Sequence, residues 1–342
     1  TMFSFMLSCG KRKPPLPPIE RVEQRVEISG FQRGNQVRLS WIMPARNATS
    51  GSVLNIARAD IYRLAESINS TQSLTEDEFA SRSTQIGSIQ ITDADFGKKS
   101  LTYFDTLDFA GQDLRLRYAI RFVNASGSKA AFSNFLLIEP APKVALSPSL
   151  QPIKVSPDNL LLEWKSPPTN IDGSTPVNIL GYNIYRASDG EKTAKSLNKT
   201  PITVNEFRDQ AFEFGTKYQY FVRAVSLGTN AEPVESIESN IVEINPKDTF
   251  APNPPEGITL AATPNTISIF FATNVERDIA GYKIFRSTDK VNWNQLTGKL
   301  LETNTFQDSK VESGKTYYYY LTAVDKFGNE SQKSEIINET VP

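Results

Sequence analysis

The sequence predicts an all-β chain of three tandem β-sandwiches, with a short helical insertion in the first. Short runs of alternating apolar residues, the pattern of a strand with one buried face, are separated by Pro, Gly, Asn and Asp. The same set of runs occurs three times at a spacing of about 100 residues, the size of one two-sheet sandwich. A chain of 342 residues has room for three such modules.

Each repeat contains an early alternating run that ends on a bulky apolar residue. These residues are Trp41, Trp164 and Phe271. Because the alternation places them on the apolar face of their strands, we expect each to fill the centre of a core.

A late strand in each repeat opens with a tyrosine, which can bury its ring and keep its hydroxyl hydrogen-bonded at a corner. The aligned tyrosines are Tyr118, Tyr218 and Tyr317. An aspartate recurs before each of them, which indicates turn or strand-end residues and not catalysts. These aspartates are Asp105, Asp209 and Asp308.

The second and third repeats resemble fibronectin type III modules. The resemblance rests on Trp164 followed by Pro167, on Gly-Tyr-x-Ile-Tyr/Phe-Arg at Gly181 and Gly281, and on the late tyrosine strand that leads to Ala-Val. The first repeat lacks the Gly-Tyr pair and has Asn-Ala in place of Ala-Val, so it is similar to these modules in a weaker form. The resemblance implies immunoglobulin-like sandwiches and says almost nothing about function.

Proline-rich joints predict the domain boundaries, because proline fixes φ and removes a ladder donor. We expect an N-terminal anchor and spacer at 1–18, a first module at 19–140, a second at 141–248 and a third at 249–342. The first module is longer than the others because of an insertion at about 67–100.

The insertion contains a helix start. Thr75 is the expected N-cap, Glu78 the reciprocal member of a capping box, and Leu74 and Phe79 the flanking hydrophobic staple. These four residues are our candidate contact for a partner. The alternative is a surface loop that covers one edge of a sheet.

The N-terminus resembles the end of a bacterial lipoprotein signal. An apolar stretch leads through Leu7 and the small residue Ser8 to Cys9, the single cysteine. The resemblance implies lipid attachment at Cys9, although Leu7 lies one place nearer the cysteine than is usual and no basic segment precedes it. The alternative is that Cys9 is a small buried residue and that 2–7 is a packed strand.

Three cations and a proline run follow the cysteine. Beside a lipid anchor, Lys11, Arg12 and Lys13 would contact anionic headgroups. The prolines within 14–18 favour an extended, semi-rigid spacer.

The composition excludes several classes of catalytic and metal site. The chain has no histidine and one cysteine, so triads with histidine, two-histidine metal faces and Cys-x-x-Cys sites are absent. The net charge of −1 shows no excess of basic residues of the kind that indicates nucleic-acid binding. Asp93 and Asp95 could contribute to calcium binding, but a full site needs six to eight oxygens, so a solvated turn is the better interpretation. We expect no catalytic residue, no metal and no cofactor.

These observations predict a non-enzymatic, lipid-anchored protein of the bacterial cell envelope whose modules bind or space protein or glycan partners. By the same resemblance, Gly10 in place of an aspartate after the cysteine indicates the outer membrane. One alternative is a structural or accessory subunit of a larger envelope complex or filament, with an uncleaved, packed N-terminus. Another is an adhesin, which predicts an exposed aromatic patch.

Overall fold

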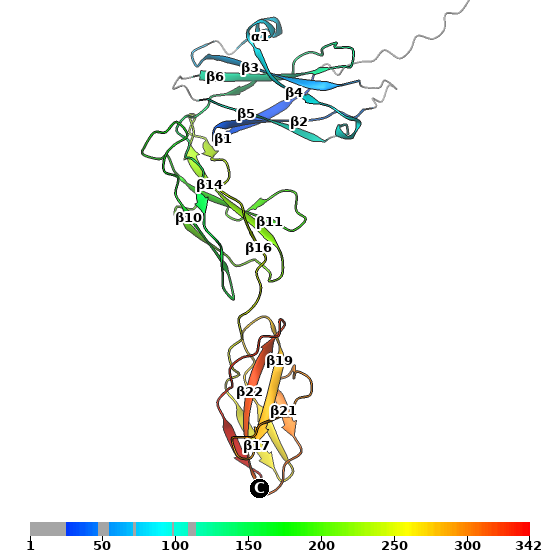
Figure 1. Cartoon of the computed structure of the whole chain (residues 1–342), viewed down its shortest axis with the longest axis vertical. Helices are drawn as coiled ribbons and strands as arrows, with labels where there is room; N and C mark the ends of the chain where they lie inside the picture. The colour runs from blue at the N-terminus through cyan, green and yellow to red at the C-terminus, as the bar shows by residue number, and fades with distance from the viewer. Residues whose placement is uncertain (1–24, 47–54, 71–72, 98, 109–113) are drawn as a thin grey trace, which may run out of the picture. The chain divides into compact units, whose positions relative to one another are not determined.

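The computed structural model describes residues 25–46, 55–70, 73–97, 99–108 and 114–342. Within these ranges, strands β1 to β23 are accompanied by one α-helix, α1, and one short 3-10 helix, η1 (Figure 1). The all-β prediction of three sandwiches with a helical insertion in the first is confirmed. In the described part of the chain, no helix has the length and apolar character needed to span a membrane.

The chain forms two compact units. The first comprises the described residues up to Ile153, with Leu162–Phe207 and Tyr218–Glu243. The second comprises Lys154–Leu161, Arg208–Lys217 and Ile244–Pro342. The first and third sandwiches therefore each lie within one unit, whereas strands of the second belong to both. The module boundaries expected from the proline-rich joints stay a prediction.

The first sandwich pairs a three-stranded sheet, ordered β1-β2-β5, with a four-stranded sheet, ordered β4-β3-β6-β7. Trp41 is 2% exposed and packs in the core between them, as the alternation predicts. The elements are β1 Ile28–Arg33, β2 Gln36–Ile42, β3 Arg58–Ser67, α1 Glu76–Arg82, β4 Thr84–Gln90, η1 Asp93–Asp95, β5 Ser100–Thr106, β6 Leu114–Val123 and β7 Leu136–Ile138.

The second sandwich has sheets ordered β13-β10-β8, with β9 also on β10, and β12-β11-β14-β15, with β16 also on β14. Trp164 is buried and meets the ring of Tyr182 edge-on, with 5.3 Å between ring centroids. The strands are β8 Ser149–Leu150, β9 Lys154–Val155, β10 Leu160–Lys165, β11 Gly181–Ser188, β12 Lys195–Ser196, β13 Glu206–Asp209, β14 Tyr218–Leu227, β15 Pro233–Glu235 and β16 Val242–Ile244.

The third sandwich repeats this plan, with sheets ordered β17-β18-β21 and β20-β19-β22-β23. Phe271 takes the place of the tryptophan and meets Tyr282 edge-on at 4.7 Å. The strands are β17 Thr259–Thr263, β18 Thr266–Phe270, β19 Ile279–Ser287, β20 Asn294–Gln295, β21 Thr305–Asp308, β22 Thr316–Asp325 and β23 Ile337–Thr340.

Strand register shows that the expected alignment of the late tyrosines is wrong. In each sandwich one arginine stands opposite one tyrosine, and the pairs are Arg63 with Tyr118, Arg186 with Tyr220, and Arg286 with Tyr319. The equivalents of Tyr118 are therefore Tyr220 and Tyr319, not Tyr218 and Tyr317. A Tyr-x-Tyr run places both rings on one face, so alternation alone could not fix the register.

The first and last strands of the first sandwich lie side by side. The amide of Asn134, just before β7, accepts from Ile28 N at 2.7 Å and donates to Ile28 O at 3.0 Å. Farther along, the amide of Gln32 accepts from Ala141 N at 2.7 Å and donates to Ala141 O at 2.9 Å. Because residue numbers rise together on the two segments, β1 and the chain through β7 run parallel.

Candidate functional site

The predicted anchor lies outside the described residues. Cys9 and the cations Lys11, Arg12 and Lys13 precede residue 25, where the description begins. Lipid attachment and headgroup contact therefore stay predictions.

The predicted helix is present, and its start is the one that the sequence indicates. Thr75 is the N-cap of α1: its Oγ1 accepts from Glu78 N at 3.3 Å, and Glu78 Oε2 accepts from Thr75 N at 2.9 Å. The hydrogen bonds from the Thr75 backbone and hydroxyl hold the pKa of Glu78 below its ordinary value. The capping box is thus confirmed, and it fixes where the helix begins.

The helix covers the outward face of the β3–β6 sheet. Phe79 is fully buried there, and its ring meets Phe132 edge-on at 5.1 Å, while Phe132 meets Tyr62 at 5.2 Å. Leu74 packs half-buried against this second apolar cluster. Phe79 therefore faces the sheet and not solvent. Whether this segment contacts a partner stays a prediction.

An ion cluster is buried on the same strands. Glu66 Oε1 accepts from Arg115 Nη2 and Arg117 Nη2, each at 2.8 Å. The three side chains are at most 3% exposed. The guanidinium of Arg117 also lies over the ring of Phe135, 5.7 Å from its centroid. Sequence alone does not reveal this cluster, because charged residues at alternate positions of a strand are typical of a face that is open to solvent.

The recurring aspartates hold strand ends together. Asp105 accepts two hydrogen bonds from Arg63 and one from Tyr118, whose hydroxyl lies 2.6 Å away. Asp308 makes the same contacts with Arg286 and with Tyr319 at 2.9 Å. Burial and the hydrogen bond to Asp105 raise the pKa of Tyr118. Asp105 and Asp308 therefore bind side chains of other strands, which is the structural role that their recurrence predicts.

The Asp93-x-Asp95 segment forms η1. Asp95 is buried and accepts from Thr92 N at 2.8 Å and from Lys99 Nζ at 2.5 Å. These hydrogen bonds, that from Lys99 foremost, lower the pKa of Asp95 to about 2. Asp93 instead pairs with Arg46. The turn is therefore present, but Asp95 is a buried cap and not a solvated residue.

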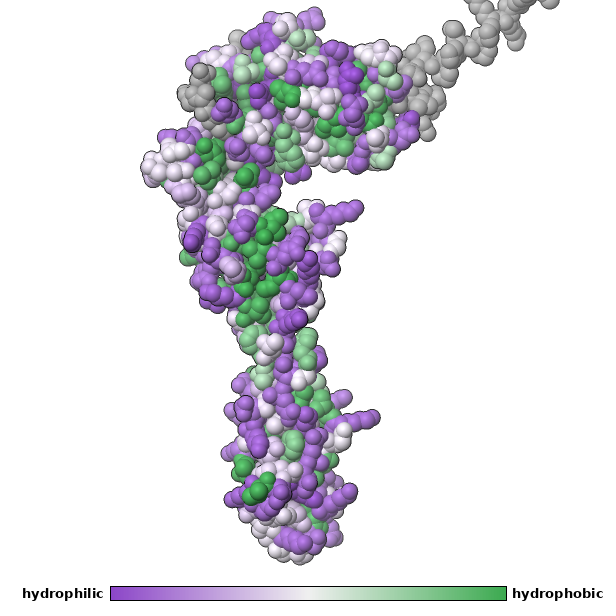
Figure 2. Space-filling view, viewed as in Figure 1, coloured by the Kyte–Doolittle hydropathy of each residue, from purple (hydrophilic) through white to green (hydrophobic). Residues whose placement is uncertain are grey.

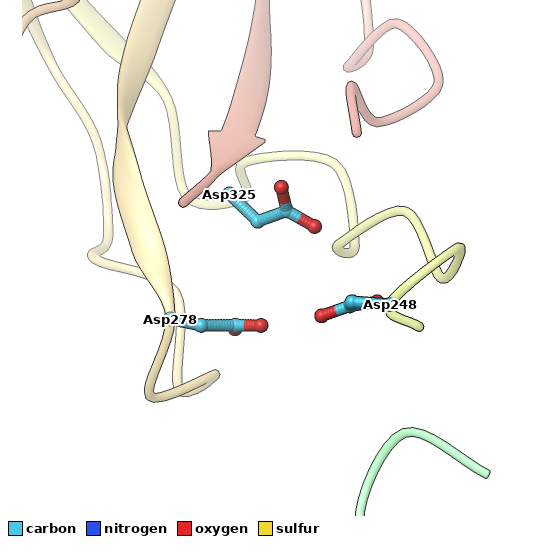
Figure 3. A group of neighbouring side chains, drawn as sticks. All are labelled: Asp248, Asp278 and Asp325. Atoms are coloured by element: carbon cyan, nitrogen blue, oxygen red, sulfur yellow. The ribbon is translucent and has the colours of Figure 1, made fainter. Parts of the chain in front are cut away.

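Three aspartates that the sequence does not connect come together in the second unit. Asp248 precedes the third sandwich, Asp278 precedes β19 and Asp325 ends β22. A carboxylate oxygen from each lies within 4.8 Å of the others. Figure 3 shows the side chains of Asp248 and Asp278 directed at one another, with Asp325 beside them. Their separation along the chain exceeds any ligand-spacing motif, so no sequence signal could have found the cluster.

This acidic cluster is held by amide donors. Asp325 accepts from Asn329 Nδ2 at 2.8 Å and from Phe327 N at 2.8 Å, and Asp248 accepts from Phe250 N at 3.0 Å. Partial burial and the neighbouring carboxylates raise the pKa of Asp248. Hard cations such as Ca²⁺ take carboxylate oxygens, but in sets of six to eight. Three aspartates supply part of such a set, and we assign no metal to them.

An aromatic row is exposed on the outward face of β1-β2-β5. Strand register places Phe31 and Phe104 on either side of Arg38. The two phenylalanines are 46% and 55% exposed, and the Arg38 guanidinium lies 5.9 Å from the centroid of the Phe104 ring. On the face of the molecule in Figure 2, hydrophobic residues form patches within a largely hydrophilic surface. An exposed aromatic patch of this kind is what the adhesin alternative predicts, and whether the row binds a partner stays a prediction.

The corresponding faces of the other sandwiches differ. In the second, the outward positions carry Leu161, Glu163 and Lys165 on β10 and Glu206 and Arg208 on β13, with no aromatic residue among them. In the third, Phe270 is 43% exposed, with Ser268 and Gln307 as polar neighbours and no arginine on these strands. The phenylalanine–arginine–phenylalanine row is therefore particular to the first sandwich.

Comparisons with known proteins do not identify a family for this chain. No family model matches the chain. Among solved structures, the chain is similar to the crystal structure of the chicken CNTN1 FN1-FN3 domains, with 16% identity over 94% of this chain and 100% of that chain and a TM-score of 0.27. A TM-score this low carries no argument about function, so the fold assignment rests on the strand pairing described above.

Proposed function

We propose that this chain is a non-enzymatic, lipid-anchored protein of the bacterial cell envelope whose tandem fibronectin type III-like sandwiches bind or space protein or glycan partners. Cys9 would carry the lipid, and Lys11 to Lys13 would contact the headgroups beside it. Gly10 in place of an aspartate favours the outer membrane.

The binding role is carried by the row of Phe31, Arg38 and Phe104. Soluble domains bury most of their aromatic surface, and exposed aromatic residues beside arginine are typical of recognition surfaces. The non-enzymatic part is supported by Asp105 and Asp308, because both are engaged by arginine and tyrosine and neither lies open to a substrate.

The anchor is tested at the native N-terminus. We expect mass spectrometry of the chain purified from envelopes to find a first residue Cys9 with two or three acyl chains. We expect Cys9→Ser to release the protein from the membrane fraction. An intact segment before Cys9 with a free thiol would contradict the anchor and favour the alternative, a subunit of a larger envelope assembly with a packed N-terminus.

The binding face is tested by crosslinking in whole cells. A photo-crosslinking residue at Ser40, beside the aromatic row, should trap envelope proteins or glycans, and Phe31→Ser with Phe104→Ser should reduce the yield about tenfold. The matched control places the crosslinker at Ser268 on the third sandwich and changes Phe270 and Phe327, which are also exposed. Equal trapping from Ser40 and Ser268, or no effect of the phenylalanine changes, would reject this face.

A further inference from the structure

The outward face of β1-β2-β5 carries two similar pairs of a phenylalanine and an arginine. The guanidinium of Arg33 lies over the ring of Phe31, 5.1 Å from its centroid, and that of Arg38 lies 5.9 Å from the centroid of Phe104. Phe31 stands opposite Arg38, and Arg33 follows two positions along β1. The Cα atoms of the two arginines are therefore diagonal neighbours, about 7–8 Å apart. The face thus presents one ring and one cation twice, side by side.

These two cations have little acidic compensation. None of the outward positions of the three strands carries a carboxylate. Arg38 forms no ion pair with a carboxylate of the described residues, and Arg33 has Glu235 at 3.5 Å, while its buried Nε has no described hydrogen-bond partner. Burial and the nearby charges of Arg223 and Arg38 lower the pKa of Arg33. An anion that binds this face from outside would therefore relieve the repulsion between the guanidiniums and accept their hydrogen bonds.

Hydroxyl groups lie beside the aromatic row. Ser29 stands opposite Ser40, and Ser40 opposite Thr102, two positions along each strand from the row. The hydroxyls of Ser29 and Ser40 are 3.1 Å apart, and with Ser100 these serines line part of a hollow of about 480 Å³. Glu27 also lines this hollow, two positions beyond Ser29. A ligand on this face therefore meets rings, guanidiniums and hydroxyls within one continuous surface, and meets a carboxylate only beyond the serines.

We propose that this face binds a polyuronate, a polysaccharide in which each sugar ring carries a carboxylate. The C–H groups of a sugar ring are attracted to the electron-rich face of a phenylalanine ring. The carboxylate of the same sugar accepts two parallel hydrogen bonds from an arginine. Two consecutive sugars would thus occupy the two phenylalanine–arginine pairs, and sugar hydroxyls would pair with Ser29 and Ser40. The inference rests on the recognition role proposed above for this face and specifies its ligand.

An acidic peptide fits this face less well. Extended peptides bind mainly by adding a strand to an open sheet edge, where their backbone groups are paired. The row crosses the face of the sheet, and side chains already occupy groups along the β1 edge, because Asn134 binds N and O of Ile28 and Gln32 binds N and O of Ala141. A polysaccharide needs no edge, because its polar groups are hydroxyls and carboxylates, which serine and arginine side chains bind directly.

Calorimetric titration of the full chain with polygalacturonate tests the proposal, with a chelator present so that calcium cannot cross-link the polymer. We expect binding that weakens as salt is added. The fully methyl-esterified polymer keeps the rings but loses the charge, and should bind at least about tenfold more weakly. Arg38→Gln and Phe104→Ser should each raise the Kd about tenfold. The matched controls, Lys165→Gln on the second sandwich and Phe270→Ser on the third, should leave it unchanged.

A conservative variant separates lost recognition from misfolding. Arg38→Lys keeps the charge but not the paired donors, so its affinity should lie between those of the wild type and Arg38→Gln. No binding at about 1 mM galacturonate residues overturns the proposal. Equal binding of the esterified polymer, or Kd values that the changes at Arg38 and Phe104 leave unaltered, would also overturn it. Tighter binding of polyglutamate of similar length would make an acidic peptide the ligand instead.

The crosslinking experiment at Ser40 distinguishes a wrong ligand from a wrong site. If Ser40 traps a partner that is lost with Phe31→Ser and Phe104→Ser, while polygalacturonate does not bind, the recognition role stands and the polyuronate assignment fails. If neither experiment detects binding, the face itself is rejected. Binding of polygalacturonate together with trapping of a glycan from Ser40 would support both.

Discussion

Replacing Glu66 by glutamine is expected to lower the free energy of unfolding of the first sandwich by about 3–5 kcal/mol at pH 7, the usual cost of breaking a buried ion pair. Glu66 is the buried carboxylate that Arg115 and Arg117 share on strands β3 and β6. In the variant, the buried guanidinium of Arg117 faces a neutral amide and the ring of Phe135. Denaturant unfolding, with hydrogen exchange of β3 and β6 to assign the transition, measures the loss.

The same cluster predicts a pH dependence. Burial by itself raises the pKa of Glu66, but the hydrogen bonds from Arg117 and Arg115 outweigh it and leave the pKa below its ordinary value of 4.5. The stability that the carboxylate contributes is complete above that value and is lost as pH falls through the folded pKa. The difference in free energy of unfolding between the wild type and Glu66→Gln should therefore become smaller below pH 4.5.

A matched control uses an exposed carboxylate of the same sandwich. Glu27→Gln should change stability by less than about 0.5 kcal/mol at any pH. A loss of less than about 1 kcal/mol in the free energy of unfolding for Glu66→Gln would contradict this prediction, and so would a difference from the wild type that grows in acid. Either result would mean that another group compensates the charges of Arg115 and Arg117.

Truncating Trp164 to alanine should destabilise the second sandwich by about 3–5 kcal/mol, as deletion of a large buried aromatic does. Trp164 is 4% exposed and packs edge-on against Tyr182. Hydrogen exchange of β11 and β14 should report the loss. The third sandwich should keep its own unfolding transition, and a single transition shared by the whole chain would contradict this expectation.

A second variant, Trp164→Phe, tests whether the core requires the indole ring itself. The indole Nε1 of Trp164 is buried and has no hydrogen-bond partner among the described residues, so phenylalanine loses volume but no hydrogen bond. Phe271 already fills the equivalent place in the third sandwich with the same edge-on contact to Tyr282. We expect a cost of less than about 1.5 kcal/mol. A cost equal to that of alanine would mean that the core requires the indole.

The sequence predicts what depends on local pattern. Alternation identified strands β2, β10 and β18 and the residues Trp41, Trp164 and Phe271 at or beside their ends, and all three residues are buried. The helix start at Thr75 and Glu78 was predictable because a capping box is complete within four residues. Both signals lie within one element and need no knowledge of its neighbours.

Features that depend on what lies beside a strand were not predictable. Arg115 and Arg117 alternate with apolar residues and resemble a face that is open to solvent, yet both are buried. The cluster of Asp248, Asp278 and Asp325 forms where a joint and two strand ends meet, which no spacing encodes. The tyrosine alignment failed because two tyrosines two positions apart share a face.

The parallel seam between β1 and β7 determines how the first sandwich carries mechanical load. A pull on the two ends of the chain enters this sandwich at Ile28 and leaves it near Ala141. These points lie at opposite ends of the seam, because Ile28 is bound to Asn134 whereas Ala141 is bound to Gln32. The pull therefore shears both amide bridges at once and cannot peel them apart in sequence. We therefore expect this sandwich to resist a pull on its two ends and to unfold abruptly, because the hydrogen bonds are loaded at the same time and break together.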